Sequence, residues 1–293
     1  MPIATRLTNT GTLLVNGIFD ENTSIAPAKF RTTSTTVYAG ELDEVTISGG
    51  AVAKREINTG VLQVKNIFDE FTGAPIVDTS LQLWLDAGQP ASYPGTGTTW
   101  TDLSGNGRTG TLTDGPTFSS ADGGSIVFDG TNDYVQCTGS LTVTAATFVT
   151  WIRRNGTQTN YAGILFSRGT NVTGLNIFPT DKLGYHWSST YYDFDSNLTI
   201  PDLTWCMVAL SVTSTAATLY LCQTSGITTA TNAAIHNSTV LDNIQIAQDD
   251  TVPGFGIYRF FKGNISAAQL YNRALTADEI TTNFNALRNR YGI

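Results

Sequence analysis

Carboxylates are the side chains of this sequence that most clearly could do chemistry, because a pair of them can act as acid and nucleophile on a glycosidic bond. Residues 80–293 contain fourteen aspartates but only one glutamate, Glu279. Glu279 ends a Thr-Ala-Asp-Glu run that is typical of a helix start. Asp193 and Asp195 are the one pair two residues apart in an extended context. We therefore predict no catalytic residues and no enzymatic activity.

The histidines and cysteines give little support for nucleophilic catalysis or for a zinc site. The two histidines, His186 and His236, are not accompanied by a Gly-x-Ser-x-Gly elbow. Cys137, Cys206 and Cys222 lie in apolar runs, and their spacing fits no zinc site. We expect buried free thiols and no required cofactor.

Composition indicates an all-β protein. The chain has 293 residues, only 14% of them charged, with 28 glycines that separate short apolar runs. A net charge of −8 disfavours nucleic acid or an anionic membrane as a partner. No apolar run suits membrane insertion or the core of a signal peptide. We expect a protein made in a cytoplasm and not secreted through a signal peptide.

The second part of the chain, residues 80–293, carries the regular short strands of a β-sandwich. Ile126 and Phe128 alternate before a polar turn at residues 129–133, which predicts a strand, a tight turn and a returning strand at Tyr134. The other main strand predictions cover residues 81–86, 141–153, 161–167, 174–178, 182–187, 204–212, 218–222, 243–247 and 255–265. Three tryptophans within these runs are expected in the core: Trp151, Trp187 and Trp205.

One helix is predicted near the end of the chain. Thr276 and Glu279 form a capping box, and Ile280, Phe284 and Leu287 follow as an apolar stripe at helical spacing. We expect this helix to pack on the sandwich.

The first part of the chain, residues 1–79, contains an internal repeat. Residues 9–23 recur as residues 58–72, with ten of the fifteen positions identical. Its strand and aromatic positions are Leu13, Val15 and Phe19 in the first copy and Leu62, Val64 and Phe68 in the second. About 79 residues make a marginal core alone, so we predict either an anchor and oligomerisation domain or a modest independent β domain that packs against the second part of the chain.

Three motifs in order give residues 80–293 a family resemblance. They are Trp-Thr-Asp-Leu-Ser-Gly-Asn-Gly at 100–107, Phe-Asp-Gly-Thr-Asn-Asp-Tyr-Val at 128–135 and Leu-Tyr-Asn-Arg-Ala-Leu-Thr at 270–276. The set resembles the laminin-G-like branch of the concanavalin A-like lectin/glucanase jelly rolls. The resemblance implies a jelly-roll β-sandwich, so with the repeat and the predicted helix we expect a small N-terminal β domain followed by a jelly roll with one C-terminal helix. The run of spaced Glu and Asp found in glucanases of that family is missing here.

The resemblance also suggests two kinds of binding site. Relatives bind calcium through loop oxygens, which here points to Asp102 and Asn106 in one loop and to Asn132 and Asp133 in another. The alternative is that these four side chains hydrogen-bond to their own turns. Carbohydrate binding would use an aromatic platform beside polar groups, and four residues of one stretch provide both: Trp187, Tyr191, Tyr192 and Asp193. Packing is the alternative for its aromatic members.

A second resemblance concerns where the protein acts. The Thr-Gly-Thr-Leu-x-Val…Phe-Asp-Glu run at residues 10–21 resembles the N-termini of structural proteins of marine tailed bacteriophages. We predict a non-enzymatic virion protein, as a capsid decoration, head fibre or tail fibre, with other virion proteins as partners. Host surface glycans and a second copy of the chain are further candidate partners. A free sugar-binding module is the alternative, and a polysaccharide depolymerase is a third.

Overall fold

The computed structural model describes residues 76–188, 194, 196–249 and 259–293, with the backbone of residues 190–191 and of five strands before residue 76. The chain divides into two compact units, residues 1–75 and 76–293. The strands of the first unit pair as β1 (Leu14–Asn16) with β2 (Lys29–Arg31), and as β3 (Glu44–Ile47), β4 (Ala51–Glu56) and β5 (Val61–Val64) in one sheet.

The repeat positions are only partly described. Val15 lies in β1, and Leu62 and Val64 lie in β5, so each copy contributes the strand that its sequence predicts. Leu13, Phe19 and Phe68 lie outside the described residues. The anchoring and oligomerisation role of residues 1–79 stays a prediction.

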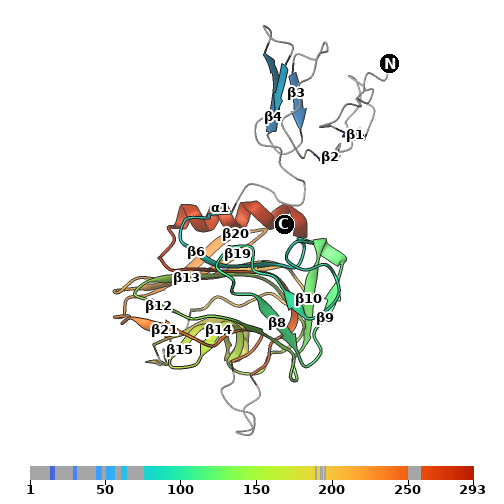
Figure 1. Cartoon of the computed structure of the whole chain (residues 1–293). Coiled ribbons are helices and arrows are strands. Elements are labelled where there is room, and N and C mark those ends of the chain that lie inside the picture. Colours follow the sequence, from blue (N-terminus) through green and yellow to red (C-terminus); the bar gives the residue numbers. More distant parts are fainter. Residues whose placement is uncertain are drawn as a thin grey trace. The chain divides into compact units, whose positions relative to one another are not determined.

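The second unit is a two-layer β-sandwich, as the sequence predicts (Figure 1). The first layer, here the helix-covered sheet, contains in spatial order β20 (Gly226–Asn232), β19 (Ala217–Gln223), β18 (Cys206–Val212), β13 (Ala146–Arg154), β23 (Lys262–Tyr271), β10 (Ser125–Asp129) and β9 (Thr117–Ser119), with β6 (Leu81–Asp86) also on β23. The second layer, here the open sheet, contains β17 (Thr190–Tyr191), β16 (Lys182–Trp187), β15 (Val172–Phe178), β14 (Ala162–Arg168), β22 (Ile244–Ile246), β11 (Tyr134–Cys137), β8 (Gly110–Thr113) and β7 (Thr99–Trp100).

Alternating apolar side chains from both layers fill the space between the sheets. Leu85, Phe148 and Ile265 enter this core from the helix-covered sheet, and Leu175 and Ile246 enter it from the open sheet. A separate pair, β12 (Leu141–Val143) with β21 (Thr239–Leu241), flanks the sandwich. The predicted strand at 141–153 is therefore two strands, β12 and β13, that belong to different sheets.

The strands around the turn at residues 129–133 are not a hairpin, contrary to the sequence prediction. β10 pairs with β9 and β23 in the helix-covered sheet, whereas β11 pairs with β8 and β22 in the open sheet. Both strands turn buried side chains, such as Phe128 and Val135, into the one core between the layers. Because two opposed sheets offer that core from opposite sides, the turn becomes a crossing from one sheet to the other.

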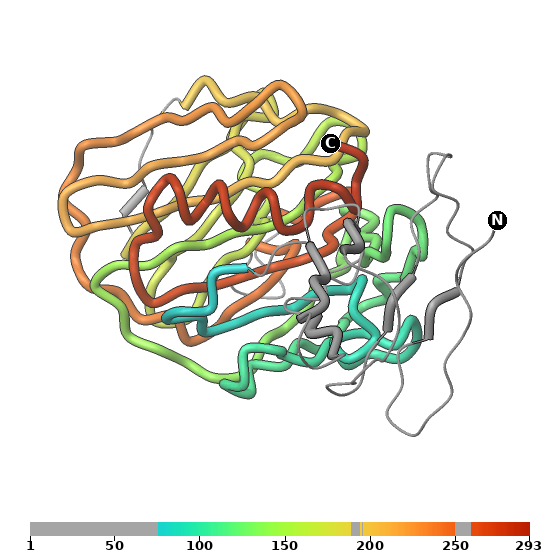
Figure 2. The backbone as a smooth tube through the Cα atoms, turned by 90° about the horizontal axis from the view of Figure 1, so that it is seen from above, coloured from blue at the N-terminus to red at the C-terminus, as the bar shows by residue number. Residues whose placement is uncertain are grey.

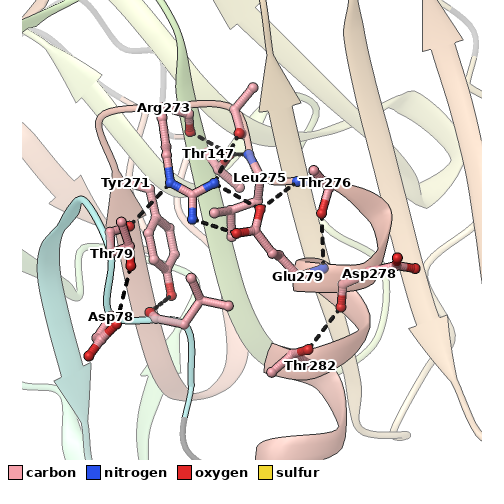
Figure 3. Close-up of polar contacts among 12 residues, drawn as sticks. Asp78, Thr79, Thr147, Tyr271, Arg273, Leu275, Thr276, Asp278, Glu279 and Thr282 are labelled. Atoms are coloured by element: carbon pink, nitrogen blue, oxygen red, sulfur yellow. Dashed lines mark hydrogen bonds and ion pairs between the residues drawn. The ribbon is translucent and has the colours of Figure 1, made fainter.

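The C-terminal helix α1 (Ala277–Leu287) begins where the capping box predicts. The Thr276 hydroxyl accepts a hydrogen bond from the Glu279 backbone N–H at 3.3 Å, and the Glu279 carboxylate accepts one from the Thr276 backbone N–H at 2.9 Å (Figure 3). Arg273 donates two hydrogen bonds to the same carboxylate, at 2.6 and 2.8 Å. These bonds, led by those from Arg273, lower the pKa of Glu279 to about 2. Glu279 is thus a structural residue.

α1 packs on the outer face of the helix-covered sheet, the face turned away from the sandwich core (Figure 2). Trp151 of β13 stacks on Phe284 with ring centroids 5.5 Å apart. It also stacks on Tyr291, in the short helix η3 (Arg288–Tyr291), at 4.4 Å. Two further short helices lie in loops: η1 (Ala121–Gly123) and η2 (Pro179–Asp181). No helix in the described part of the chain is long and apolar enough to cross a membrane.

We expect Phe284→Ala to lower the free energy of unfolding of residues 76–293 by about 3–5 kcal/mol, because it leaves a cavity beside Trp151. All five tryptophans lie between residues 84 and 205, so tryptophan fluorescence during urea denaturation of the full-length chain reports on this unit. Asn285→Ala, at an exposed position of the same helix, is the matched control and should cost less than about 0.5 kcal/mol. Equal losses in the two variants would contradict the packing role.

Candidate functional site

The first calcium candidate, Asp102, has its carboxylate filled by protein donors. Its Oδ1 accepts hydrogen bonds from the backbone N–H groups of Trp84 and Ser104, both at 2.9 Å. Its Oδ2 accepts from the backbone N–H of Arg108 and from the Ser104 hydroxyl, also at 2.9 Å. Asn106 donates its side-chain amide to the carbonyl of Leu81 at 3.0 Å. These contacts support the alternative in which the side chains hold their own loop.

The second calcium candidate pair, Asn132 and Asp133, precedes β11 and lies at the opposite end of that strand from the Asp102 loop. Asp133 is buried and accepts a hydrogen bond from the Asp129 backbone N–H at 3.0 Å, while Asn132 is exposed. Burial raises the pKa of Asp133, and the charges of Asp129 and Asp114 add to this. β11 separates this turn from the Asp102 loop, so the four candidates do not form one site. In the described ranges no three His, Cys, Asp or Glu side chains gather as a metal site.

The residues predicted to form a sugar-binding platform do not form one accessible surface in the described structure. Trp187 is fully buried in the sandwich core, and its indole N–H donates to the carbonyl of Asn237 at 2.6 Å. A sugar cannot reach that ring, so the packing alternative holds for Trp187. Tyr191 lies in the edge strand β17, opposite His186, and Tyr192 and Asp193 lie outside the described residues.

The outer face of the open sheet is where the structure brings polar and aromatic side chains together. Paired residues on neighbouring strands point to the same face, and their registers define a line across the sheet that we call the transverse row. From β7 to β16 it contains Thr99, Thr111, Gln136, Gln245, Phe166, Gly174 and His186. Six strand spacings make it about 29 Å long.

One end of the transverse row is accessible. Thr99 and Thr111 are exposed, and Gln136 is half-buried. Tyr134 lies two residues from Gln136 on β11 and therefore on the same outer face, opposite the buried Val135. The Tyr134 hydroxyl makes no hydrogen bond to any described residue. This open end combines an aromatic ring with uncharged hydrogen-bonding groups and has no acidic side chain in the row.

The two glutamines mark the transition from the accessible end to the buried end. Gln245 donates its side-chain amide to Oε1 of Gln136 at 3.2 Å, and Gln136 donates to the carbonyls of Cys137 and Ile244. Gln245 is only 6% exposed, and its Oε1 has no hydrogen-bond partner among the described atoms. A buried, unpartnered acceptor of this kind calls for a water or a ligand.

The other end of the row is a buried aromatic cluster. His186 lies edge-on to Phe166 and Phe178, with centroids 5.7 and 6.0 Å apart, and faces Tyr161 at 6.2 Å. Asn176 lies on β15 two residues after Gly174, and its partners on the neighbouring strands are two glycines, Gly163 and Gly184. The Asn176 side chain is fully buried, and neither its oxygen nor its nitrogen has a hydrogen-bond partner in the described structure.

Two arginines and one aspartate border this buried end, and we call them the arginine rim: Arg168, Asp249 and Arg259. Arg168 Nε donates to Oδ1 of Asp249 at 2.7 Å, and Arg259 Nη1 lies 3.4 Å from Oδ2. The Arg259 guanidinium stands over the ring of Tyr161, 5.2 Å from its centroid. Burial lowers the pKa of His186 to about 3, and the charges of both arginines act in the same direction.

Sequence reasoning missed Tyr134, Gln136 and Gln245 as site residues. A usable signal was present, because Tyr134 and Gln136 alternate with the apolar Val135 and Cys137 and must face away from the core. That signal does not show which strands lie beside β11. Gln136 and Gln245 are 109 residues apart, and only strand pairing brings them together.

Comparison with a family model places the second unit among known folds. Residues 129–281, just over half of the chain, match the laminin G model described as Concanavalin A-like lectin/glucanases superfamily. A comparison with curated proteins gives no match.

Three solved structures illustrate the shared fold. Domain 4 of AbnA, a GH43 extracellular arabinanase from Geobacillus stearothermophilus, in complex with arabinotriose, has a TM-score of 0.52 at 18% identity over 71% of this chain and 98% of that one. The Trypanosoma rangeli sialidase has a TM-score of 0.52 at 13% identity, over 82% of this chain and 36% of the sialidase. The binding domain of botulinum neurotoxin serotype D has a TM-score of 0.51 at 12% identity, over 71% of this chain and 51% of that one. These identities establish a common fold alone.

We expect Asp102→Ala to lower the free energy of unfolding by about 3 kcal/mol, because four donors around the carboxylate lose their acceptor. Asn106→Ala, at the exposed end of the same loop, is the control and should cost less than about 1 kcal/mol. Thermal melts followed by tryptophan fluorescence, in EDTA and in calcium, measure both effects. If calcium stabilises the wild type but not Asp102→Ala, the loop is a calcium site and the structural assignment is wrong.

We also expect the second unit to lose stability as the pH falls below 6.5, the ordinary pKa of histidine. The unfolded chain then binds a proton at His186, whereas the folded chain does not until about pH 3. The loss should approach about 1.4 kcal/mol per pH unit for this residue. His186→Gln should reduce the slope between pH 6 and 5, measured by urea denaturation. His236→Gln is the comparison, since burial lowers the pKa of His236 as well. If His186→Gln leaves the pH dependence of the free energy of unfolding unchanged, His186 is not the cause of the loss of stability.

Proposed function

Because the chain belongs to the concanavalin A-like lectin/glucanases superfamily, we propose that its second unit binds glycans on the outer face of the open sheet without cleaving them. The observation that carries the proposal is the open end of the transverse row. There Tyr134 stands beside Gln136, Thr111 and Thr113 on one accessible surface.

The residue types of this surface match the chemistry of a sugar. A pyranose presents an apolar face that stacks on an aromatic ring and hydroxyl groups that both donate and accept hydrogen bonds. Tyr134 offers the ring and a hydroxyl, while Gln136 and the threonines offer uncharged donors and acceptors. The accessible part of the row, from Thr99 on β7 to Gln136 on β11, spans two strand spacings, about 10 Å, which suits one or two sugar residues.

The C-terminal helix occupies part of the opposite outer face. α1 and η3 cover the helix-covered sheet, where Trp151, Met207 and Tyr271 are buried beneath them. The polar row therefore lies on the face that the C-terminal helix leaves uncovered, which supports placing the site there.

Binding without hydrolysis is the form of the proposal that the described residues favour. A glycosidase needs two carboxylates placed on either side of the bond. Glu279 is engaged by Arg273 and the helix start. Asp249, at the buried end of the transverse row, is itself fully buried and paired with two arginines.

We further propose that the first unit attaches the protein to a larger particle, the virion of a tailed bacteriophage. The support is the internal repeat at residues 9–23 and 58–72 and the resemblance of residues 10–21 to phage structural proteins. Many displayed copies would turn a weak single site into useful avidity. An antibody against residues 76–293, applied with gold to purified particles, tests this. Gold on capsid or tail is expected, and antigen found only in the soluble fraction would contradict it.

We expect Tyr134→Ala and Gln136→Ala each to weaken binding at least tenfold to whichever oligosaccharide the full-length wild type selects on a glycan array. Loss of stacking, or of one hydrogen bond, is worth about 1.4 kcal/mol in binding. Titration calorimetry measures the affinity.

Thr229→Ala is the matched control, because Thr229 is an exposed residue of β20 in the other sheet. It should bind like the wild type, and urea denaturation should show that all three variants stay folded. Wild-type affinity in both Tyr134→Ala and Gln136→Ala would place the glycan elsewhere and remove the support for this site.

A further inference from the structure

The arginine rim carries an excess of positive charge beside the proposed glycan site. Two guanidinium groups, on Arg168 and Arg259, share the single carboxylate of Asp249. Asp249 is fully buried, whereas the two arginine side chains are 12% and 18% exposed. The rim thus has a local charge of about +1 in a chain whose net charge is −8.

The guanidinium groups retain unused donors. An arginine has five N–H donors in a planar fork. Within the described structure Arg168 uses Nε on Asp249, which leaves Nη1 and Nη2 without acceptors. Arg259 uses only Nη1, in a long contact of 3.4 Å. Asp242, between β21 and β22, accepts hydrogen bonds from Thr170 in the turn that follows β14 and none from Arg168 in the described structure.

The rim is also held in position. Asp249 fixes Arg168 at 2.7 Å, and Tyr161 supports Arg259 from below at 5.2 Å. Tyr161 in turn contacts Phe178 edge-on, with centroids 5.1 Å apart. Side chains fixed before binding lose less conformational entropy when a ligand arrives.

The rim continues the transverse row. Arg168 lies on β14 two residues from Phe166, on the same face, and Phe166 is the direct neighbour of Gln245. β14 is two strands from β11, about 10 Å away, so a substituent of a glycan bound over Tyr134 and Gln136 can extend toward the guanidinium donors.

We infer that the arginine rim binds an anionic substituent, a carboxylate or a sulfate, of the glycan that occupies the transverse row, so that the protein selects acidic over neutral glycans. This inference rests on the proposed glycan-binding function. A planar guanidinium forms two parallel hydrogen bonds with a carboxylate or sulfate oxygen pair, which a neutral hydroxyl cannot match.

The test uses the full-length protein and pairs of oligosaccharides that differ only in charge. One pair is a galacturonic acid hexamer and its methyl ester, and the other is a sulfated galactan oligosaccharide and its desulfated form. We expect the acidic member of at least one pair to bind at least tenfold more tightly by titration calorimetry, and the preference to shrink as salt rises. The pair that shows it identifies carboxylate or sulfate as the recognised group.

Three variants separate binding from folding. Arg259→Gln should abolish the preference for the acidic member and leave binding of the neutral one unchanged. Asp249→Asn should keep or strengthen the preference, because it removes the competing carboxylate, whereas a purely structural rim would weaken it. Arg153→Gln, which removes the same charge from the other sheet, is the matched control.

The outcomes also distinguish this inference from the proposed function. If acidic and neutral glycans bind equally and Tyr134→Ala weakens both, the glycan site stands and the anionic selectivity is overturned. An acidic preference that Arg259→Gln leaves intact overturns the rim as its source. If no glycan of either kind binds, both the inference and the proposed function fail.

Discussion

The contact between the C-terminal helix and one sheet decides how the rest of this sandwich can be used. Trp151 packs against Phe284 and Tyr291, and the buried ion pair between Arg290 and Asp86 ties the end of the chain to β6. This contact buries a second apolar cluster on top of the core between the sheets. A β-sandwich has two outer faces, and the helix closes one of them. Surface chemistry that needs a broad sheet face is therefore left to the open sheet.

At β8 and β11 the open sheet carries polar groups on its outer face, because that part of the face is accessible. Thr111, Tyr134 and Gln136 alternate with inward apolar residues, so that each strand serves the core and the surface at once. Toward β15 the same face becomes buried, and Asn176 is left with unpaired polar atoms. Buried polar groups without partners cost stability and are kept where a ligand or water completes them. The accessible part of this face is therefore the part near β8 and β11.

Electrostatics adds specificity to a fold that many proteins share. Fold likeness at 12–18% identity says nothing of ligand choice. The arginine rim is a local feature of this chain, because Asp249 neutralises only one of two guanidinium groups. A buried, shared carboxylate orients both arginines and leaves donors facing outward. The chemistry of the acidic group that we propose there depends on this imbalance.

By itself, the sequence determined the elements whose causes are local. Alternation placed β6 and β16 at their observed bounds, and the capping box at Thr276 placed the start of α1. The all-β class and the single glutamate of residues 80–293 were equally plain. Tertiary structure decided the rest: that β10 and β11 belong to different sheets, and that Gln136 meets Gln245. Each of these depends on strand pairing between residues far apart in the chain, which no short window of sequence contains.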